Sequence, residues 1–304
     1  MKPYIFIILL SLPITLLAQT DTTYWNKGGK FGINFSQATL TNWAAGGGNT
    51  VAGSVYFNYI VDYQKGSILW QNTIDMGLGW IKEARSEQQK ADDRLVLTSS
   101  FGKRLIPNNK KWFYNATVDF RTQFLEGYDP EKDPNQNKPI SKFMAPGYLM
   151  TSIGIDWRPN DNFNLTLSPV TGKFTFVQDD SLSAAGAFGV DPGEKFRAEF
   201  GASLKASYNK EIFENVQFTS NLLLFSDYMD NPGKIDVNWE NILNLKVNSW
   251  LSANIYNQII YDYDIKFYEV DSNGNDILST ATDKWQFKNI ISLGLAVQFG
   301  GKRG

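Results

Sequence analysis

Charged side chains recur at every second position of several segments, with apolar residues at the positions between them. In KWFYNATVDFRTQF (residues 111–124), Asp119 and Arg121 alternate with Val118 and Phe120. A β-strand directs successive side chains to opposite faces, so the charges share one face and the apolar residues share the other. A charged face of this kind can select small charged solutes, or its opposite charges can neutralise one another.

The same alternation, followed along the chain, assigns a set of charged residues to one inner face. They are Asp75, Arg94, Asp119, Arg121, Arg197, Glu199, Lys205, Asp236, Glu240, Lys246 and Lys288. Their signs are nearly balanced, which leaves two interpretations open. In the first, the charges line a passage that selects charged or zwitterionic solutes. In the second, they form a self-neutralising network that fills the interior.

Composition excludes several other kinds of site. The 304 residues include no histidine and no cysteine, which removes His-based nucleophilic catalysis, His or Cys metal ligation and disulfides. We predict no catalytic residues, no metal and no cofactor; a carboxylate-only mechanism with Asp119 or Glu240 has no positive support. The acidic loops 129–139 and 271–276 resemble calcium-binding loops only weakly, since the glycine and glutamate of an EF-hand are misplaced or missing. The 29 basic and 31 acidic residues are dispersed, so no nucleic acid partner is expected.

Alternation of apolar and polar residues runs through most of the chain and predicts about twelve β-strands. The segments are 29–38, 51–63, 67–81, 93–105, 111–124, 147–158, 162–171, 195–208, 215–226, 234–247, 250–267 and 284–299. Most are much longer than the strands of about 5–6 residues that are usual in soluble proteins. A tilted strand needs about 9–11 residues to cross the hydrocarbon of a membrane. The length therefore favours membrane-spanning strands.

The connections between these segments alternate in size. The short ones are 64–66, 106–110, 159–161, 209–214 and 248–249, and the long ones are 39–50, 82–92, 125–146, 172–194, 227–233 and 268–283. Outer-membrane barrels have an even number of antiparallel strands, short periplasmic turns and longer extracellular loops. We therefore predict an all-β, transmembrane antiparallel β-barrel of about twelve strands. The alternative is a secreted β-sandwich, which has the same period but shorter strands and polar outward faces.

The composition and the first residues agree with export to a membrane. Aromatic residues make up 14% of the chain although the mean hydropathy is −0.30, which suits an apolar outside around a polar inside. Lys2 and the apolar stretch 4–17 have the pattern of a signal peptide that ends near Ala18. We expect residues 1–18 to be removed. Residues 19–28 would then form a periplasmic segment, 29–299 the barrel and 300–304 a periplasmic tail.

Three stretches carry a family resemblance. They are FGINFSQATLTNWAAGGGNTVAGSVYFNY at 31–59, KKWFYNATVDFRTQF at 110–124 and FMAPGYL at 143–149. In these aromatic and glycine patterns the chain resembles the Bacteroidota outer-membrane proteins catalogued as domain of unknown function 3078. The resemblance implies a barrel in the bacterial outer membrane without an assigned activity, and it supplies no catalytic or ligand residues.

Two of the long loops contain further candidate residues. In loop 39–50, Gly46, Gly47 and Gly48 permit unusual backbone angles, and Trp43 could fold inward as a constriction or dock on a partner. In loop 172–194, the apolar stretch around Phe188 could form a plug or a protein contact. The simpler interpretations are a flexible extracellular loop and a packing cluster on the barrel rim.

These observations predict a porin-like outer-membrane protein that acts as a narrow passive channel for small polar or charged solutes. Barrels of eight strands hold only side chains, whereas those of 16–18 enclose an aqueous channel, so about twelve strands do not decide whether the interior is open. The alternative is a non-conducting accessory barrel in a secretion, assembly or envelope complex. The expected partners are outer-membrane lipid and lipopolysaccharide, with other outer-membrane or periplasmic proteins in the second case.

Overall fold

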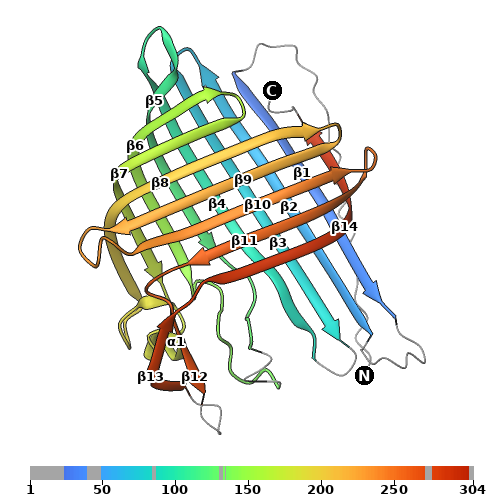
Figure 1. The fold of residues 1–304 in the computed structure, drawn as a ribbon, viewed down its shortest axis with the longest axis vertical. Coiled ribbons are helices and arrows are strands. Elements are labelled where there is room, and N and C mark those ends of the chain that lie inside the picture. Colours follow the sequence, from blue (N-terminus) through green and yellow to red (C-terminus); the bar gives the residue numbers. More distant parts are fainter. Residues whose placement is uncertain are drawn as a thin grey trace.

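The protein is a closed antiparallel β-barrel of twelve strands, which confirms the predicted fold class. The computed structural model describes residues 24–39, 49–83, 87–129, 133, 135–270 and 276–300. Each strand from β1 to β10 pairs with the next along the chain, and β14 closes the barrel between β11 and β1 (Figure 1). Closure leaves no unpaired strand edge, so the backbone hydrogen bonds are satisfied within the barrel wall.

The barrel strands have 11 to 18 residues each. Their bounds are β1 Trp25–Ala38, β2 Thr50–Lys65, β3 Ile68–Glu83, β4 Gln89–Ile106, β5 Asn109–Thr122, β6 Gly147–Asn160, β7 Phe163–Phe176, β8 Phe196–Phe213, β9 Val216–Asp227, β10 Ile235–Lys246, β11 Leu251–Tyr261 and β14 Gln286–Gly300. Each corresponds to one of the predicted segments. The first strand begins at Trp25, inside the segment that we expected to precede the barrel.

The predicted strand 250–267 is shorter than expected because a turn interrupts it. Residue Asp262 accepts a hydrogen bond from the backbone N–H of Asp264 at 2.9 Å, the pattern of an Asx turn, which competes with an extended strand. The chain then forms a second, two-stranded sheet from β12 (Lys266–Val270) and β13 (Asp276–Asp283). This hairpin projects from the rim of the barrel, within the segment that we expected to be mainly a loop (Figure 1).

The outer face of the barrel is apolar and the inner face is polar. On β14, Phe287 and Ile291 are 74% and 70% exposed, whereas Ser292 and Gln286 on the opposite face are partly buried. Among the described residues, thirteen polar or charged side chains are buried against six hydrophobic ones. A water-soluble protein buries its apolar side chains instead. This reversed arrangement is the one that places lipid outside a barrel and polar groups inside it.

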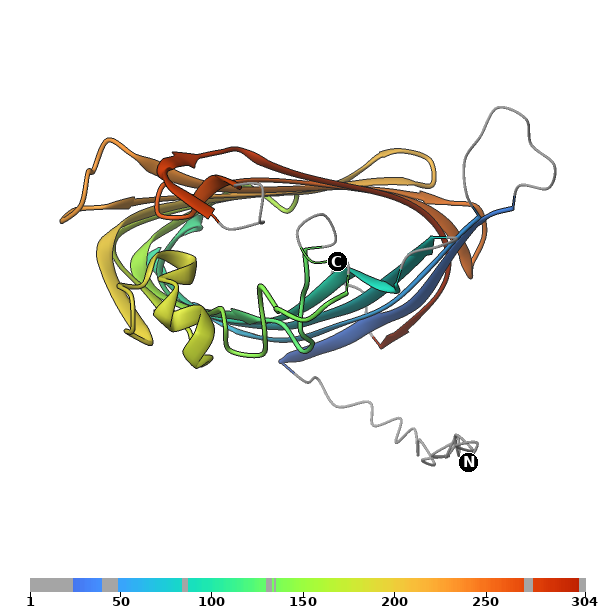
Figure 2. The same ribbon diagram turned by 90° about the horizontal axis from the view of Figure 1, so that it is seen from below.

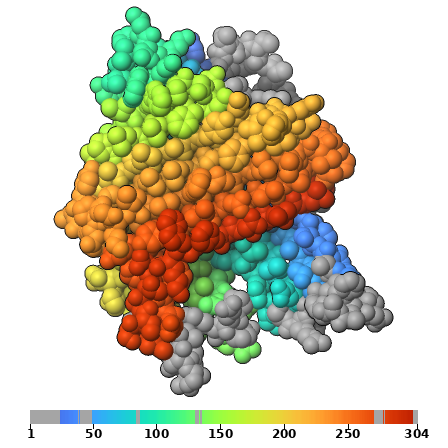
Figure 3. Space-filling model, in the orientation of Figure 1, coloured from blue at the N-terminus to red at the C-terminus, as the bar shows by residue number. Residues whose placement is uncertain are grey.

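The long connections lie at one end of the barrel and the short turns at the other. The helices α1 (Asp180–Ala184) and η1 (Ala187–Gly189) and the β12–β13 hairpin are all at the lower end in Figure 1. Seen from that end, the strands enclose an oblong ring (Figure 2), and the space-filling view shows the broad wall formed by the later strands (Figure 3). No helix among the described residues is long and apolar enough to cross a membrane.

Candidate functional site

The inner face of the barrel carries the charged residues that the alternation identified. All of them lie on barrel strands, at positions opposite in direction to the exposed apolar residues of the same strand. The structure brings most of them into two groups, one at the end with the long loops and one on the wall formed by β3–β5. We call the end with the long loops the loop end and the other the turn end.

The first group surrounds the ammonium of Lys173, on β7. Its Nζ lies 2.7 Å from a carboxylate oxygen of Asp236, 3.3 Å from one of Asp262 and 3.4 Å from one of Glu199. Lys173 and Glu199 are only 8% and 4% exposed, so little water screens these contacts. The three acids come from β10, from the turn after β11 and from β8. One lysine therefore connects elements that are not neighbours in the barrel wall.

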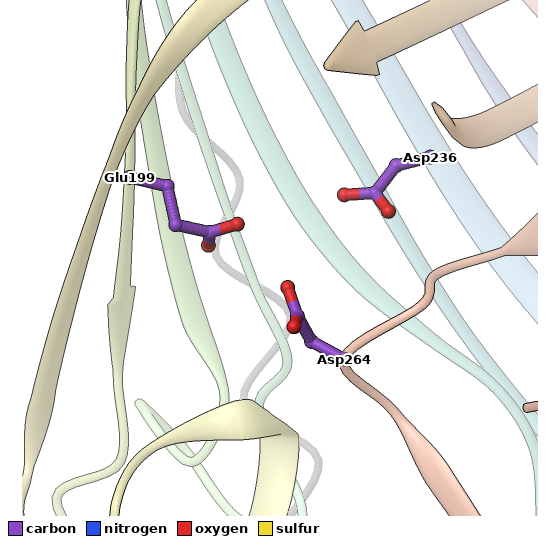
Figure 4. A group of neighbouring side chains, drawn as sticks. All are labelled: Glu199, Asp236 and Asp264. Atoms are coloured by element: carbon purple, nitrogen blue, oxygen red, sulfur yellow. The ribbon is translucent and has the colours of Figure 1, made fainter. Parts of the chain in front are cut away.

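Arg197 adds a second cation to this group. Its Nη2 lies 2.8 Å from Asp264 and 3.7 Å from Glu199, and its Nη1 donates a hydrogen bond to the carbonyl oxygen of Gly189 in the rim loop at 2.8 Å. The carboxylates of Glu199, Asp236 and Asp264 point toward one another (Figure 4) and each has an oxygen within 4.8 Å of the others.

The acidic cluster, which we define as Glu199, Asp236, Asp262 and Asp264, has four carboxylates against the two cations Lys173 and Arg197. With all six groups ionised, the four carboxylates and the two cations together carry a net charge of −2. Oxygen ligands of this kind suit hard cations. The ammonium and guanidinium of the protein occupy the positions that a bound cation would take, so we assign no metal to the cluster. The cluster therefore has more negative charge than the two bound cations, Lys173 and Arg197, neutralise.

Lys173, Asp262 and Asp264 were not among the predicted residues, for a physical reason. A register shift between Ser168 and Thr171 of β7 inserts a bulge, after which odd instead of even positions face inward. The predicted strand ended at residue 171, so Lys173 fell in the predicted connection 172–194, and alternation continued from Ser168 would in any case place it on the outer face. The two aspartates lie in the turn that interrupts the predicted strand 250–267. The Pro169 within β7 is the one sequence signal that indicates an irregularity there.

The second group lies on β3, β4 and β5. Arg94 Nε is 2.6 Å from Asp75 and its Nη1 contacts Asp92, while Arg121 Nε is 2.6 Å from Asp119. Each guanidinium thus has a carboxylate partner on its own or the adjacent strand. Lys288 Nζ, on β14, lies 2.6 Å from Asp92. Since β1, β2 and β3 separate β14 from β4, this ion pair spans the inside of the barrel.

The remaining predicted charges are less closely paired. Glu240 accepts weak hydrogen bonds from Tyr256 at 3.4 Å and Gln258 at 3.3 Å. Lys205 and Lys246, which lie toward the turn end, have no carboxylate oxygen within 4.0 Å in the described part of the chain. The inner face is therefore most acidic at the loop end, whereas its loosely held cations lie at the opposite end.

Several polar contacts join strands that are not neighbours, and they restrict the interior. Arg158 Nη2 on β6 donates to Gln71 on β3 at 2.7 Å, and Lys288 and Lys173 make the spans described above. Long side chains of this kind narrow the space enclosed by the strands. The interior is thus polar, contains fixed charges and is crossed by side-chain contacts. Both the solute-selecting passage and the self-neutralising network inferred from the sequence have these properties.

Of the predicted candidate residues in the loops, the structure describes only Phe188. Trp43, Gly46, Gly47 and Gly48 lie outside the described residues. Phe188 packs, partly buried, against a small apolar cluster at the loop end that consists of Ala145, Val177, Leu182 and Val190. The structure places it in a rim cluster, as the simpler interpretation of that loop had it.

An ion pair fixes this rim cluster to the neighbouring loop. Lys142 Nζ lies 2.8 Å from Asp179, whose carboxylate also accepts hydrogen bonds from the backbone N–H groups of Ser181 and Leu182 at the start of α1. The bond from Lys142, followed by those from Ser181 and Leu182, holds the pKa of the Asp179 carboxyl well below its ordinary value. The same contact raises the pKa of Lys142.

Comparisons with known proteins agree with the family resemblance. The profile of the family described as "Protein of unknown function (DUF3078)" matches residues 35–128, from the end of β1 to just beyond β5. No curated protein matches the chain.

Solved structures of several outer-membrane barrels match this chain at low similarity. The COG4313 outer membrane channel from Pseudomonas putida F1 is 11% identical with a TM-score of 0.40, covering 91% of this chain and 96% of that one. The NanC porin is 10% identical with a TM-score of 0.39, covering 90% and 99%. The translocator domain of the autotransporter NalP from Neisseria meningitidis is 7% identical with a TM-score of 0.32, covering 92% and 90%. The fold assignment rests on the strand pairing of this chain itself.

Proposed function

We propose that this protein is a narrow passive channel of the bacterial outer membrane, for small polar or charged solutes, with a preference for cations. The observation that carries the proposal is the reversed polarity of the barrel, in which an apolar outer face surrounds an inner face of fixed charges. The outer face would contact lipid and lipopolysaccharide. The inner polar groups would replace part of the hydration shell of a passing solute.

The sign preference follows from the acidic cluster. The cluster has more carboxylates than the two cations that it binds, and it lies at the loop end, which faces the outside if the long loops are extracellular as in other outer-membrane barrels. A mouth with excess negative charge concentrates cations and repels anions, most strongly at low ionic strength where screening is weak. The carboxylates already hold an ammonium and a guanidinium, so solutes with such groups are the best candidates.

Planar-bilayer recording tests this proposal. The purified protein should give discrete conductance steps, and its reversal potential in a salt gradient should show cation preference. The double variant D262N/D264N removes two charges from the cluster and should lower that preference at least twofold. D180N/D191N is the matched control, because it also removes two charges, from exposed side chains at the same rim that lie outside the cluster. A bilayer without steps, or equal effects of both variants, would contradict the proposal.

A second function has one observation in its favour. The contacts that span the interior, Lys288 with Asp92 and Arg158 with Gln71, would also suit an accessory barrel that conducts nothing. In that case the bilayer would be silent and the protein would purify stably with other envelope proteins. Removing the contacts by K288M/R158M would then leave the bilayer silent, whereas in a channel it would raise the conductance.

A further inference from the structure

A row of polar side chains crosses the outer face of the barrel. Ser220 on β9 pairs with Asn241 on β10, Asn241 pairs with Asn257 on β11, and Asn257 pairs with Asn289 on β14. We call these four residues the amide row. They share the outer face with exposed apolar residues of the same strands, such as Trp239, Phe287 and Ile291. The strands concerned form the wall that faces the viewer in Figures 1 and 3.

The hydrogen bonds of the row are incomplete. Asn289 donates to Asn257 and Trp239 donates to Ser220, but the side-chain amide of Asn241 has no hydrogen-bond partner in the described part of the chain. The opposite wall shows a contrasting case. There Asn72 donates to the carbonyl oxygen of Val61 at 3.0 Å and accepts from Ser99 at 2.8 Å, so its amide is satisfied within the barrel.

Asn241 lies near the middle of β10, where an amide without a hydrogen-bond partner is unfavourable. It is the seventh of the twelve residues of β10, and apolar neighbours flank it along the strand, Trp239 on one side and Leu243 on the other. Neither the turn end nor the loop end supplies polar groups or bulk water at the middle of a membrane-spanning strand. An amide exposed to hydrocarbon is stabilised by a hydrogen bond to another polar group, and asparagines on membrane-spanning helices promote helix association for this reason.

We propose that the amide row is a contact surface for a second copy of this chain in the membrane. An amide carries both a donor and an acceptor, so a surface with unused amides is complementary to itself. A twofold axis along the membrane normal uses the same patch on both subunits, with Asn241 of one facing Asn257 of the other. The strands are tilted and the row runs across them, so the two rows cross obliquely and meet at these central residues. The flanking apolar side chains pack around the crossing point.

Disulfide cross-linking in native membranes tests the proposal, because the chain has no cysteine of its own. Membranes that contain both the N241C and the N257C variant should give a covalent dimer on oxidation, because these two positions face each other across the twofold axis. The matched controls are I74C on β3 and V118C on β5, whose parent side chains are 37% and 47% exposed on the other wall. We expect at least tenfold more dimer from the amide row than from the controls. Equal yields on both walls, or cross-links to a different polypeptide, would overturn the proposal.

A second variant separates association from folding. N241L/N257L replaces the central amides by apolar groups and should leave the barrel folded, as its unchanged mobility shift on heating in gels would show. Native mass spectrometry should then give at least a fivefold smaller fraction of dimer than the unmodified protein. A dimer fraction that does not change would overturn the proposal. Neither test depends on conductance, so failure of the dimer and failure of the channel are distinguishable.

Discussion

At the scale of single residues, Lys173 offsets part of the negative charge of the acidic cluster. Replacing it by methionine leaves Glu199, Asp236 and Asp262 close together without the ammonium between them. Removal of one partner from a buried ion pair typically lowers the free energy of unfolding by about 3–5 kcal/mol, because the remaining charge stays buried without a partner. We predict that K173M lowers the free energy of unfolding in lipid vesicles by about 3 kcal/mol, measured by urea titration.

The control for this prediction is K210M on β8, near the turn end, where Lys210 is exposed. Surface substitutions of this kind usually change stability by less than about 0.5 kcal/mol. The triple variant K173M/E199Q/D236N should recover part of the loss by removing the unpaired charges. If K173M were as stable as the unmodified protein, the role assigned to Lys173 would be wrong.

Asp179 gives the rim cluster a predictable dependence on pH. Its pKa is lower in the folded rim than in an unfolded chain, where it is about 3.9. The carboxylate therefore stabilises the rim fully above that unfolded value, and the contribution is lost as the pH falls through the lower folded value. Protection of the Ser181 and Leu182 amides from hydrogen exchange should accordingly decrease below a pH of about 4. In D179N this dependence should disappear, whereas in D180N it should persist.

At the scale of elements, the bulge of β7 brings two backbones unusually close. A Cβ on Gly154 of β6 would collide with the backbone carbonyl oxygen of Leu167 and with Ser168, which are the residues next to the bulge. A backbone neighbour cannot rotate away as a side chain can. We predict that G154A destabilises the barrel by about 2 kcal/mol, within the range of overpacking effects. At Gly53 of β2 the nearest such atom is 3.7 Å away, so G53A should unfold like the unmodified protein.

The same bulge marks the limit of what could be predicted at this scale. Uninterrupted alternation identified strands such as β14 and the inward direction of Lys288 and Asp119. It could not identify Lys173, because the inserted residue breaks the alternation, so the predicted strand ended at residue 171 and Lys173 fell in the predicted connection 172–194. Nor could it separate β11 from the β12–β13 hairpin, since the Asx turn at Asp262 depends on a local hydrogen bond and not on periodicity.

At the scale of the whole molecule, strand length and loop alternation were sufficient to predict the closed barrel of twelve strands. A strand that crosses a membrane must form hydrogen bonds to a neighbouring strand on each of its two edges. An even number of such strands closes the barrel with the first and last strands ending on the same side of the membrane. The contacts across the interior were not predictable, because they join residues up to 196 positions apart in the chain, as Lys288 and Asp92 are. Alternation gives the face of each residue but not its partner across the barrel.

The central claim is that polar residues of this barrel face a water-filled interior while its apolar residues face lipid. Two adjacent residues of β14 test it most directly. Ser292 points inward and is partly buried, whereas Leu293 points outward and is 54% exposed. In intact outer membranes, a small, water-soluble thiol reagent should modify the variant S292C rapidly and the variant L293C hardly at all. Modification of L293C alone would reverse the two faces, and protection of both variants would show that water does not fill the interior.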